Sequence, residues 1–131
     1  YNCTCDNGTS QSDVLRRIVL KCNLHKVDLD ISIHFNAGAA DKKGNGHTTG
    51  TEVLIYSSGS RAKPYAEKVA KSISAIGFKN RGVKVRDNLY FLHRTNSPAM
   101  LIECCFVDDK DDVKMYNYKR MAAAIVKGIL Q

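Results

Sequence analysis

The stretch that most constrains the fold is residues 28–37, DLDISIHFNA, because its middle alternates between apolar and polar side chains. The apolar positions are 29, 31 and 33, and the polar side chains between them are Asp30, Ser32 and His34. A period of two predicts a β-strand with two unlike faces. His34 closes the alternation and a small-residue run follows it, so the pattern places a histidine at the carboxyl end of a strand. In α/β proteins, reactive groups are commonly held at that position.

A second stretch, residues 99–106, is an apolar run, AMLIECCF, that contains one acid, Glu103. A short apolar run of this kind predicts a buried strand. A carboxylate in such a strand is costly to bury unless another group pairs with it or the protein uses it. The hypothesis from these two stretches is that His34 and Glu103 belong to one site.

Length and hydropathy exclude several classes of protein. A chain of 131 residues is enough for one domain with its own core. No window approaches the ~20 consecutive apolar residues of a membrane-spanning helix. The N-terminus has neither the basic region nor the apolar core of a signal peptide. The chain begins at Tyr1 without a methionine, so we expect processing or truncation to have removed what came before it.

The net charge of +7, from 20 basic and 13 acidic residues, indicates an anionic partner. Nucleic acid and anionic cell-wall polymers satisfy that condition equally. The basic residues are scattered rather than grouped, and no recognition helix or RNA-binding motif is present. We therefore expect no nucleic acid among the partners.

The number of cysteines, five, is odd, so they cannot all pair within one chain. Cys3 and Cys5 have a C-x-C spacing, but without a second close pair this spacing is weak evidence for zinc. Cys104 and Cys105 are adjacent, and in a regular strand they cannot both face the core. We expect buried free thiols of the kind found in reducing compartments.

Periodicity along the chain predicts alternating helices and strands. Helical patterns cover residues 12–26, 64–77 and 115–129, and strand patterns cover residues 28–37, 51–56, 83–85, 89–93 and 99–106. Residues 41–50 are polar and glycine-rich, which predicts a long flexible loop. Four aspartates at positions 108, 109, 111 and 112 precede the last helix and complement its dipole. This alternation predicts an α/β fold with a mostly parallel central sheet flanked by helices.

Three segments together resemble a known family. They are SIHFNA at residues 32–37, GTEV at residues 50–53 and PAMLIE at residues 98–103. Their order and their residues resemble those of the zinc-dependent N-acetylmuramoyl-L-alanine amidases of the amidase-3 family. That family includes bacterial cell-wall hydrolases and phage endolysins. The resemblance extends over nearly the whole chain. It implies an N-terminally truncated amidase-3-like α/β fold, in which residues 1–131 form the C-terminal three-quarters of a single catalytic domain.

The resemblance also implies roles for two residues. The histidine of the family's S-I-H-x-N-A strand is a zinc ligand and corresponds to His34. The glutamate of the strand after Pro98 is the catalytic acid/base and corresponds to Glu103. The reaction implied is hydrolysis of the peptidoglycan amide between N-acetylmuramic acid and L-alanine. The chemistry agrees, because Zn²⁺ lowers the pKa of bound water toward ~7 and a carboxylate can carry the proton of that water to the leaving amine.

The sequence departs from the family pattern at its start. Family members begin with a strand whose Gly-His-Gly-like turn gives one ligand, and a helix that gives a glutamate ligand follows. Neither is present here. A catalytic zinc site needs three protein ligands, so we expect the other two to lie upstream of Tyr1. His47 and His93 are weaker candidates for a functional role, and His25, on the first helix, is expected to be structural or exposed. The chain alone is then expected to be inactive, with doubtful zinc occupancy.

Truncation also has a structural consequence, because loss of a strand and a helix should expose an apolar sheet edge and favour self-association. The other expected partners are peptidoglycan and, by charge, anionic wall polymers. The expected location is secreted or in the cell wall, or that of a phage lysin reaching the wall from the host cytoplasm. Residues 41–50 are candidates for substrate contact by position.

One alternative from another class stays open. It is a cell-wall-binding module that has kept the groove and lost catalysis. Glu103 counts against this alternative, because a pure binder has no need to keep a carboxylate in an apolar strand.

Overall fold

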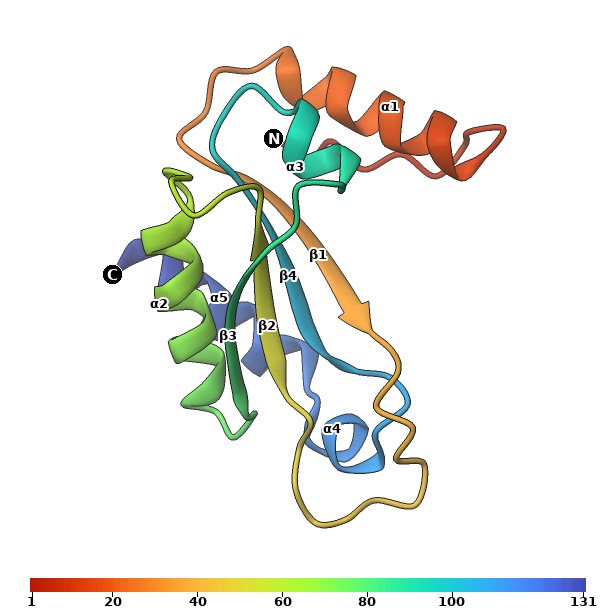
Figure 1. Ribbon diagram of the computed structural model, residues 1–131, viewed down its shortest axis with the longest axis vertical. Coiled ribbons are helices and arrows are strands. Elements are labelled where there is room, and N and C mark those ends of the chain that lie inside the picture. The colour runs from red at the N-terminus through yellow and green to blue at the C-terminus, as the bar shows by residue number, and fades with distance from the viewer.

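The computed structural model describes residues 1–131 and contains one four-stranded sheet with the strand order β1-β4-β2-β3 (Figure 1). The strands are β1 (Asp30–Asn36), β2 (Thr51–Ile55), β3 (Asn80–Val85) and β4 (Ala99–Phe106). β1 pairs with β4 in parallel and β2 pairs with β3 in parallel, whereas β2 and β4 are antiparallel. The sheet is therefore mixed and mostly parallel, as predicted, with its antiparallel pairing at the centre.

Five helices surround the sheet: α1 (Gln11–Asn23), α2 (Lys63–Ser74), α3 (Tyr90–Arg94), α4 (Lys110–Met115) and α5 (Tyr118–Leu130). Side chains that cap the first turn fix several helix starts. Ser10 Oγ accepts the backbone N–H of Asp13 at α1, and Asn117 Oδ1 accepts that of Arg120 at α5. α1 and α3 lie at one end of the sheet and α4 lies at the other (Figure 1). No helix has the length and apolar character needed to cross a bilayer.

Two apolar clusters follow the alternation of side chains along β4. On one face, Met100 and Ile102 pack with residues of α2 and α5 in the larger cluster. On the other face, Ala99 and Leu101 pack with residues of α1 and α3 in a smaller cluster. The smaller cluster involves only the beginning of β4, so it leaves the end of that face, where Glu103 lies, to polar side chains.

The prediction of a strand at residues 89–93 is wrong, because this segment forms α3. Phe91 and Leu92 are consecutive and both buried, and both pack in the cluster under α1. A five-residue apolar run fits a strand and a short buried helix equally well, and tertiary packing decides between them.

The last helix is not continuous as predicted. The chain leaves the helix after Met115, and Tyr116 and Asn117 adopt extended backbone angles before α5 begins. The Asn117 side chain, which accepts a backbone N–H of the next turn, competes with a continuous helix and starts a new one.

Cys104 and Cys105 are both buried in the larger cluster, contrary to the expectation from a regular strand. The ladder between β1 and β4 explains this. His34 pairs with Glu103 and Asn36 pairs with Phe106, so one residue of β1 stands opposite two residues of β4. This β-bulge breaks the period of two and turns both thiols toward the core.

Candidate active site

Strand register brings the two predicted site residues together. His34 pairs with Glu103 in the parallel ladder of β1 and β4, and Glu52 pairs with Glu103 in the antiparallel ladder of β2 and β4. Paired residues of neighbouring strands point to the same face of a sheet. The residues next to them, Val53 and Ile102, pack under α2 and α5. The three polar side chains therefore form a row, the His34–Glu103–Glu52 row, on the opposite face.

Glu52 is the paired carboxylate of this row. Its Oε1 accepts from Asn36 Nδ2 at 3.2 Å and its Oε2 accepts from Arg81 Nε at 3.0 Å. The Arg81 guanidinium also lies 5.0 Å from the ring centroid of Phe106. Glu52 is only 8% exposed, so the carboxylate of this ion pair is shielded from water, whereas the Arg81 side chain is 35% exposed. Through these contacts Glu52, on β2, connects the ends of β1 and β3.

Glu103 is the unpaired carboxylate of the row. Its Oε2 is buried and has no hydrogen-bond partner. Burial, and secondarily the charge of Glu52, raise the pKa of the Glu103 carboxyl. A carboxyl whose proton affinity is raised in this way is better suited to accept and return a proton than an ordinary glutamate.

His34 is the exposed member of the row. Its Nε2 lies 2.8 Å from Ser32 Oγ, the next polar position on the same face of β1. Partial desolvation lowers the pKa of His34, which favours the neutral imidazole. A neutral imidazole is the form that binds metal ions.

A zinc site with three protein ligands is not assembled around His34 by these residues, because no cluster of three ligand groups includes it. The other histidines lie elsewhere. His25 stacks on Tyr1, with ring centroids 3.7 Å apart. His93 lies on α3, not at a strand end as predicted, and stacks on Tyr56 at the opposite end of the sheet from Glu103. Among the residues present, His34 thus fits the role of one ligand of a zinc site, and Glu103 fits the role of its general base.

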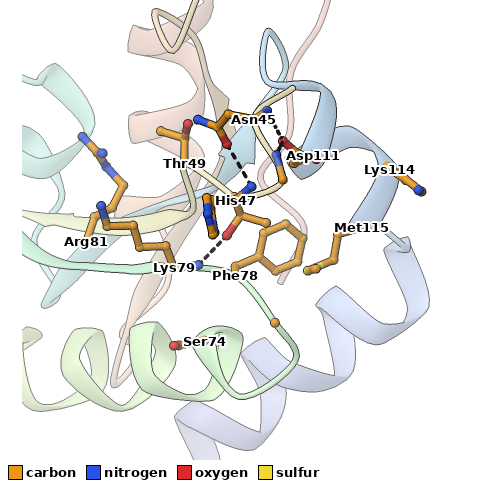
Figure 2. A pocket seen from close by; sticks show the side chains of 13 residues that line it. Asn45, His47, Thr49, Ser74, Phe78, Lys79, Arg81, Asp111, Lys114 and Met115 are labelled. Carbon is orange, nitrogen blue, oxygen red and sulfur yellow. Dashed lines mark hydrogen bonds between the residues drawn. The ribbon is translucent and has the colours of Figure 1, made fainter. Parts of the chain in front are cut away.

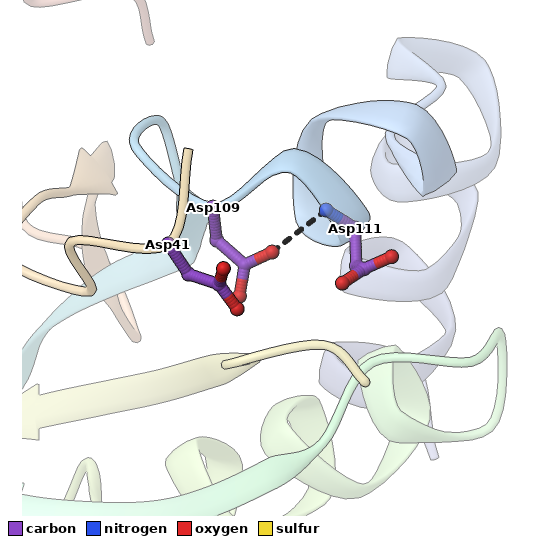
Figure 3. Close-up of side chains that lie close together, drawn as sticks. All are labelled: Asp41, Asp109 and Asp111. Atoms are coloured by element: carbon purple, nitrogen blue, oxygen red, sulfur yellow. Dashed lines mark hydrogen bonds between the residues drawn. The ribbon is translucent and has the colours of Figure 1, made fainter. Parts of the chain in front are cut away.

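Asp41, Asp109 and Asp111 form an acidic cluster whose carboxylate oxygens lie within 4.8 Å of one another (Figure 3). Carboxylate oxygens suit hard cations, so the cluster could hold a metal ion. Its oxygens already accept hydrogen bonds, however. Asp109 Oδ1 accepts the backbone N–H of Asp111 at 2.7 Å, and Asp111 Oδ2 accepts that of Asn45 at 2.8 Å. These bonds account for the cluster without an ion.

The same acidic segment anchors the loop between β1 and β2. Asp108 accepts the backbone N–H groups of residues 38–40, Asp111 accepts those of residues 45 and 46, and Asp112 accepts that of Gly50. The loop that is expected to be flexible is therefore tied along its length. Of the four aspartates expected to serve a helix dipole, Asp109 caps α4 and also accepts the backbone N–H of Thr49, and the others mainly hold this loop.

Part of the anchored loop borders a cavity of about 1000 Å³ (Figure 2). Its walls include residues 45–49 of the loop and the side chains of Lys79 and Arg81. Figure 2 shows Lys79 and Arg81 on one side of the cavity and Lys114 extending away from them. Because Arg81 also binds Glu52, the cavity adjoins the His34–Glu103–Glu52 row.

Asn36, Glu52 and Arg81 are site residues to which the sequence gives no role, although Asn36 and Glu52 lie in segments that carry the family resemblance. The sequence predicts only that Glu52 is paired or on the solvent side, and it is paired and buried. Its place next to Glu103 depends on the antiparallel insertion of β2 beside β4, which no local period encodes.

Comparisons with known proteins agree with this architecture. The amidase-3 family model, described as N-acetylmuramoyl-L-alanine amidase, matches residues 1–131. The chain is 39% identical over 129 residues to an uncharacterized 38.4 kDa protein of Clostridium perfringens, covering 95% of this chain and 36% of that protein. It is 33% identical over 110 residues to the endolysin of Bacillus phage SPP1, covering 82% of this chain and 40% of that protein.

A solved structure gives the same result for the fold. The catalytic domain of the CD27L endolysin targeting Clostridia difficile matches with a TM-score of 0.80 at 30% sequence identity, covering 93% of this chain and 64% of that one. The chain spans about a third of the length of the curated relatives it matches, 29% and 36% for two proteins of Clostridium perfringens. The match to the family model over all 131 residues shows that the chain belongs to the amidase-3 family of N-acetylmuramoyl-L-alanine amidases.

Proposed function

We propose that the protein containing this chain hydrolyses the peptidoglycan amide between N-acetylmuramic acid and L-alanine, with zinc as cofactor and Glu103 as acid/base. The observation that carries this proposal is the pairing of His34 with Glu103 on adjacent strands, with a buried Glu103 oxygen that no protein group satisfies. A histidine and an unpaired carboxylate side by side are the parts that metal-assisted amide hydrolysis needs from the protein.

Glu103 carries the proton in this proposal. Its carboxylate takes a proton from the attacking water and later delivers it to the nitrogen of L-alanine as the C–N bond breaks. Zinc, when bound, lowers the pKa of water toward ~7 and polarises the amide carbonyl. The raised pKa of Glu103 helps it to hold the proton between the two steps.

His34 holds the metal in this proposal, and Ser32 fixes the orientation of its ring through the contact with Nε2. A catalytic zinc site needs three protein ligands, and among the histidines of this chain only His34 is assigned to that role. By itself this chain should bind zinc weakly and show little activity, as part of a single catalytic domain.

The substrate and the location follow from the same reasoning. The net charge of +7 favours anionic wall polymers as a further partner of the peptidoglycan hydrolase. Relatives named endolysin and cell wall amidase support action on the wall, either after secretion or as a phage lysin reaching the wall from the host cytoplasm. The exposed edge of β1 is the surface through which the chain would self-associate.

The test is metal dependence measured together with a glutamate variant. The full-length protein should bind one zinc ion, lose wall-lytic activity on chelation and regain it with Zn²⁺. Glu103→Ala should keep the zinc and lose the activity, whereas Glu67→Ala, an exposed glutamate of α2, should keep both. Absence of zinc together with full activity of Glu103→Ala would leave the wall-binding alternative as the better account.

A further inference from the structure

The N-terminal segment, residues 1–5, lies along the C-terminal half of α1, and two contacts fix which residues face each other. The Tyr1 ring stacks on the His25 ring, with centroids 3.7 Å apart. Lys21 Nζ donates to the backbone carbonyl of Thr4 at 3.0 Å. The segment therefore runs antiparallel to the helix, and the residues between these contacts, Cys3 on the segment and Cys22 on the helix, stand opposite each other.

Packing also brings these two cysteines to the same place in the fold. Cys3 packs against the apolar cluster that contains Cys22, and both line a cavity of about 550 Å³. Cys3 and Asp30 are also the two groups that, after burial, most affect the pKa of the Cys22 thiol. Cys5 is engaged elsewhere, because its Sγ donates to Asn7 Oδ1 at 3.1 Å.

We propose that Cys3 and Cys22 are a site of reversible covalent modification, at which a low-molecular-weight disulfide converts the two thiols into an intramolecular disulfide. The sequence alone predicts only free thiols, and all five cysteines are free in this structure. The facing positions of the two cysteines in the fold are what add the oxidised form. The bond would tie residues 1–5 to α1.

The reaction is thiol–disulfide exchange, with glutathione disulfide as the representative oxidant. Cys3 reacts first, because burial, and secondarily contacts with Cys3 and Asp30, raise the pKa of the Cys22 thiol to about 12. The Cys3 sulfur bonds to one glutathione sulfur, and the other glutathione leaves. The Cys22 sulfur then bonds to the Cys3 sulfur and releases the second glutathione. The protein loses two electrons and two protons, and both end on the two glutathione thiols.

The bond has a consequence for the sheet. The cavity beside the two cysteines has residues 1–4 on one wall and residues 29–34 on the other, including His34. Oxidation would fix the first wall against the strand that carries His34. Reduction would leave that wall held only by the Tyr1 stacking contact, the Lys21 hydrogen bond and apolar packing.

The experiment is to equilibrate the native full-length protein with glutathione buffers of increasing oxidising strength, block free thiols and map tryptic peptides. The expected product is the peptide ending at Arg16 joined to the peptide of residues 22–26. Fragment ions between positions 3 and 5 should assign the bond to Cys3. The oxidised protein should melt at a temperature higher by on the order of 10 °C, from the chain entropy that such a loop removes.

Two variants make the assignment independent of fragmentation. Cys5→Ser should form the same linked peptide at the same buffer ratio, whereas Cys3→Ser should lose it. In guanidinium chloride the preference for Cys3 over Cys5 should disappear, because only the fold sets it. The proposal is overturned if the native protein gives no linked peptide, if glutathione stays bound to Cys3, or if Cys3→Ser links through Cys5.

Discussion

Glu52 and Glu103 stand directly opposite each other in the antiparallel ladder between β2 and β4, with both side chains on the face away from α2 and α5. Glu52 is bonded to Arg81 and Asn36, whereas Glu103 has a buried oxygen without a partner. The two neighbouring carboxylates thus have different roles. Glu52 holds strand ends together as an ion-paired carboxylate, and Glu103 stays available to bind a proton.

Replacing Glu103 by Gln should stabilise the fold near neutral pH. The folded-state pKa of Glu103 is raised, chiefly by burial and then by the charge of Glu52, so its ionised form disfavours folding. The gain in the free energy of unfolding from Glu103→Gln should be full above the folded-state pKa of Glu103. It should vanish as the pH falls below the unfolded-state pKa. Thermal unfolding of both proteins across the acidic range measures this. A variant less stable than the wild type at pH 7 would contradict the assignment of an unpaired carboxylate.

Replacing Asp109 by Ala should destabilise the protein and release the loop between β1 and β2. The Asp109 carboxylate is fully buried and accepts backbone N–H groups from Thr49, Asp111 and Asp112. Loss of a buried acceptor that serves several donors should cost about 3 kcal/mol or more in the free energy of unfolding. Urea denaturation measures this cost, and exposed Asp87→Ala is the control, expected within about 0.5 kcal/mol of wild type.

The ionisation of Asp109 also gives this stabilisation a pH dependence. Burial opposes ionisation, but hydrogen bonds from Thr49 and from the backbone outweigh it and lower the pKa of Asp109. A lowered folded-state pKa means that the contribution is complete above the unfolded-state pKa of ~3.9 and is lost as the pH falls through the folded-state value. The difference in stability between wild type and Asp109→Ala should therefore shrink only in strongly acidic solution.

Replacing Gly128 by Ala should separate α2 from α5. A Cβ at Gly128 would lie 2.6 Å from Val69 Cα and 2.9 Å from Val69 N, and backbone atoms cannot move aside as a side chain can. The gain in helix propensity is about 1 kcal/mol, and overpacking typically costs about 1–3 kcal/mol, so we expect a net loss of stability. Gly59→Ala is the matched control, because nothing lies within 4 Å of its Cβ. Equal stability of the two variants would argue against this close approach of the helices.

Replacing Ile33 by Lys should reduce self-association of the chain. β1 is an edge strand, and its Ile33 side chain is 60% exposed. Unpaired backbone groups beside exposed apolar side chains favour strand-to-strand association, and a lysine on the edge opposes it. Sedimentation velocity at several concentrations measures the effect. Val126→Lys on α5, which also replaces an exposed apolar side chain, should leave the association unchanged.

The parts of the fold that sequence reasoning predicts are those with a strong local signal. The alternation around His34 and the apolar run around Glu103 predict two strands, and both are present with the two residues in register. The helical stripes of α1, α2 and α5 are also present, with boundaries a few residues different from those predicted. Periodicity reports which face of a segment is buried, and that is sufficient for these elements.

The parts that sequence reasoning misses depend on contacts between distant segments. The bonds of Glu52 with Asn36 and Arg81 join three strands, and the aspartates after β4 hold the backbone of a loop far earlier in the chain. The bulge that buries Cys104 beside Cys105 exists only in the ladder with β1. No local pattern carries this information, because each feature requires the strand order to be known first.

The most direct test of the central claim is chemical identification of the bond cleaved by the full-length protein in purified peptidoglycan. The account predicts new L-alanine amino termini without new reducing sugar ends. Glu103→Gln should lower the rate of their release by at least ~10²-fold, the usual contribution of a general acid/base. Release of reducing sugars instead, or an unchanged rate of L-alanine amine release by Glu103→Gln, would contradict it.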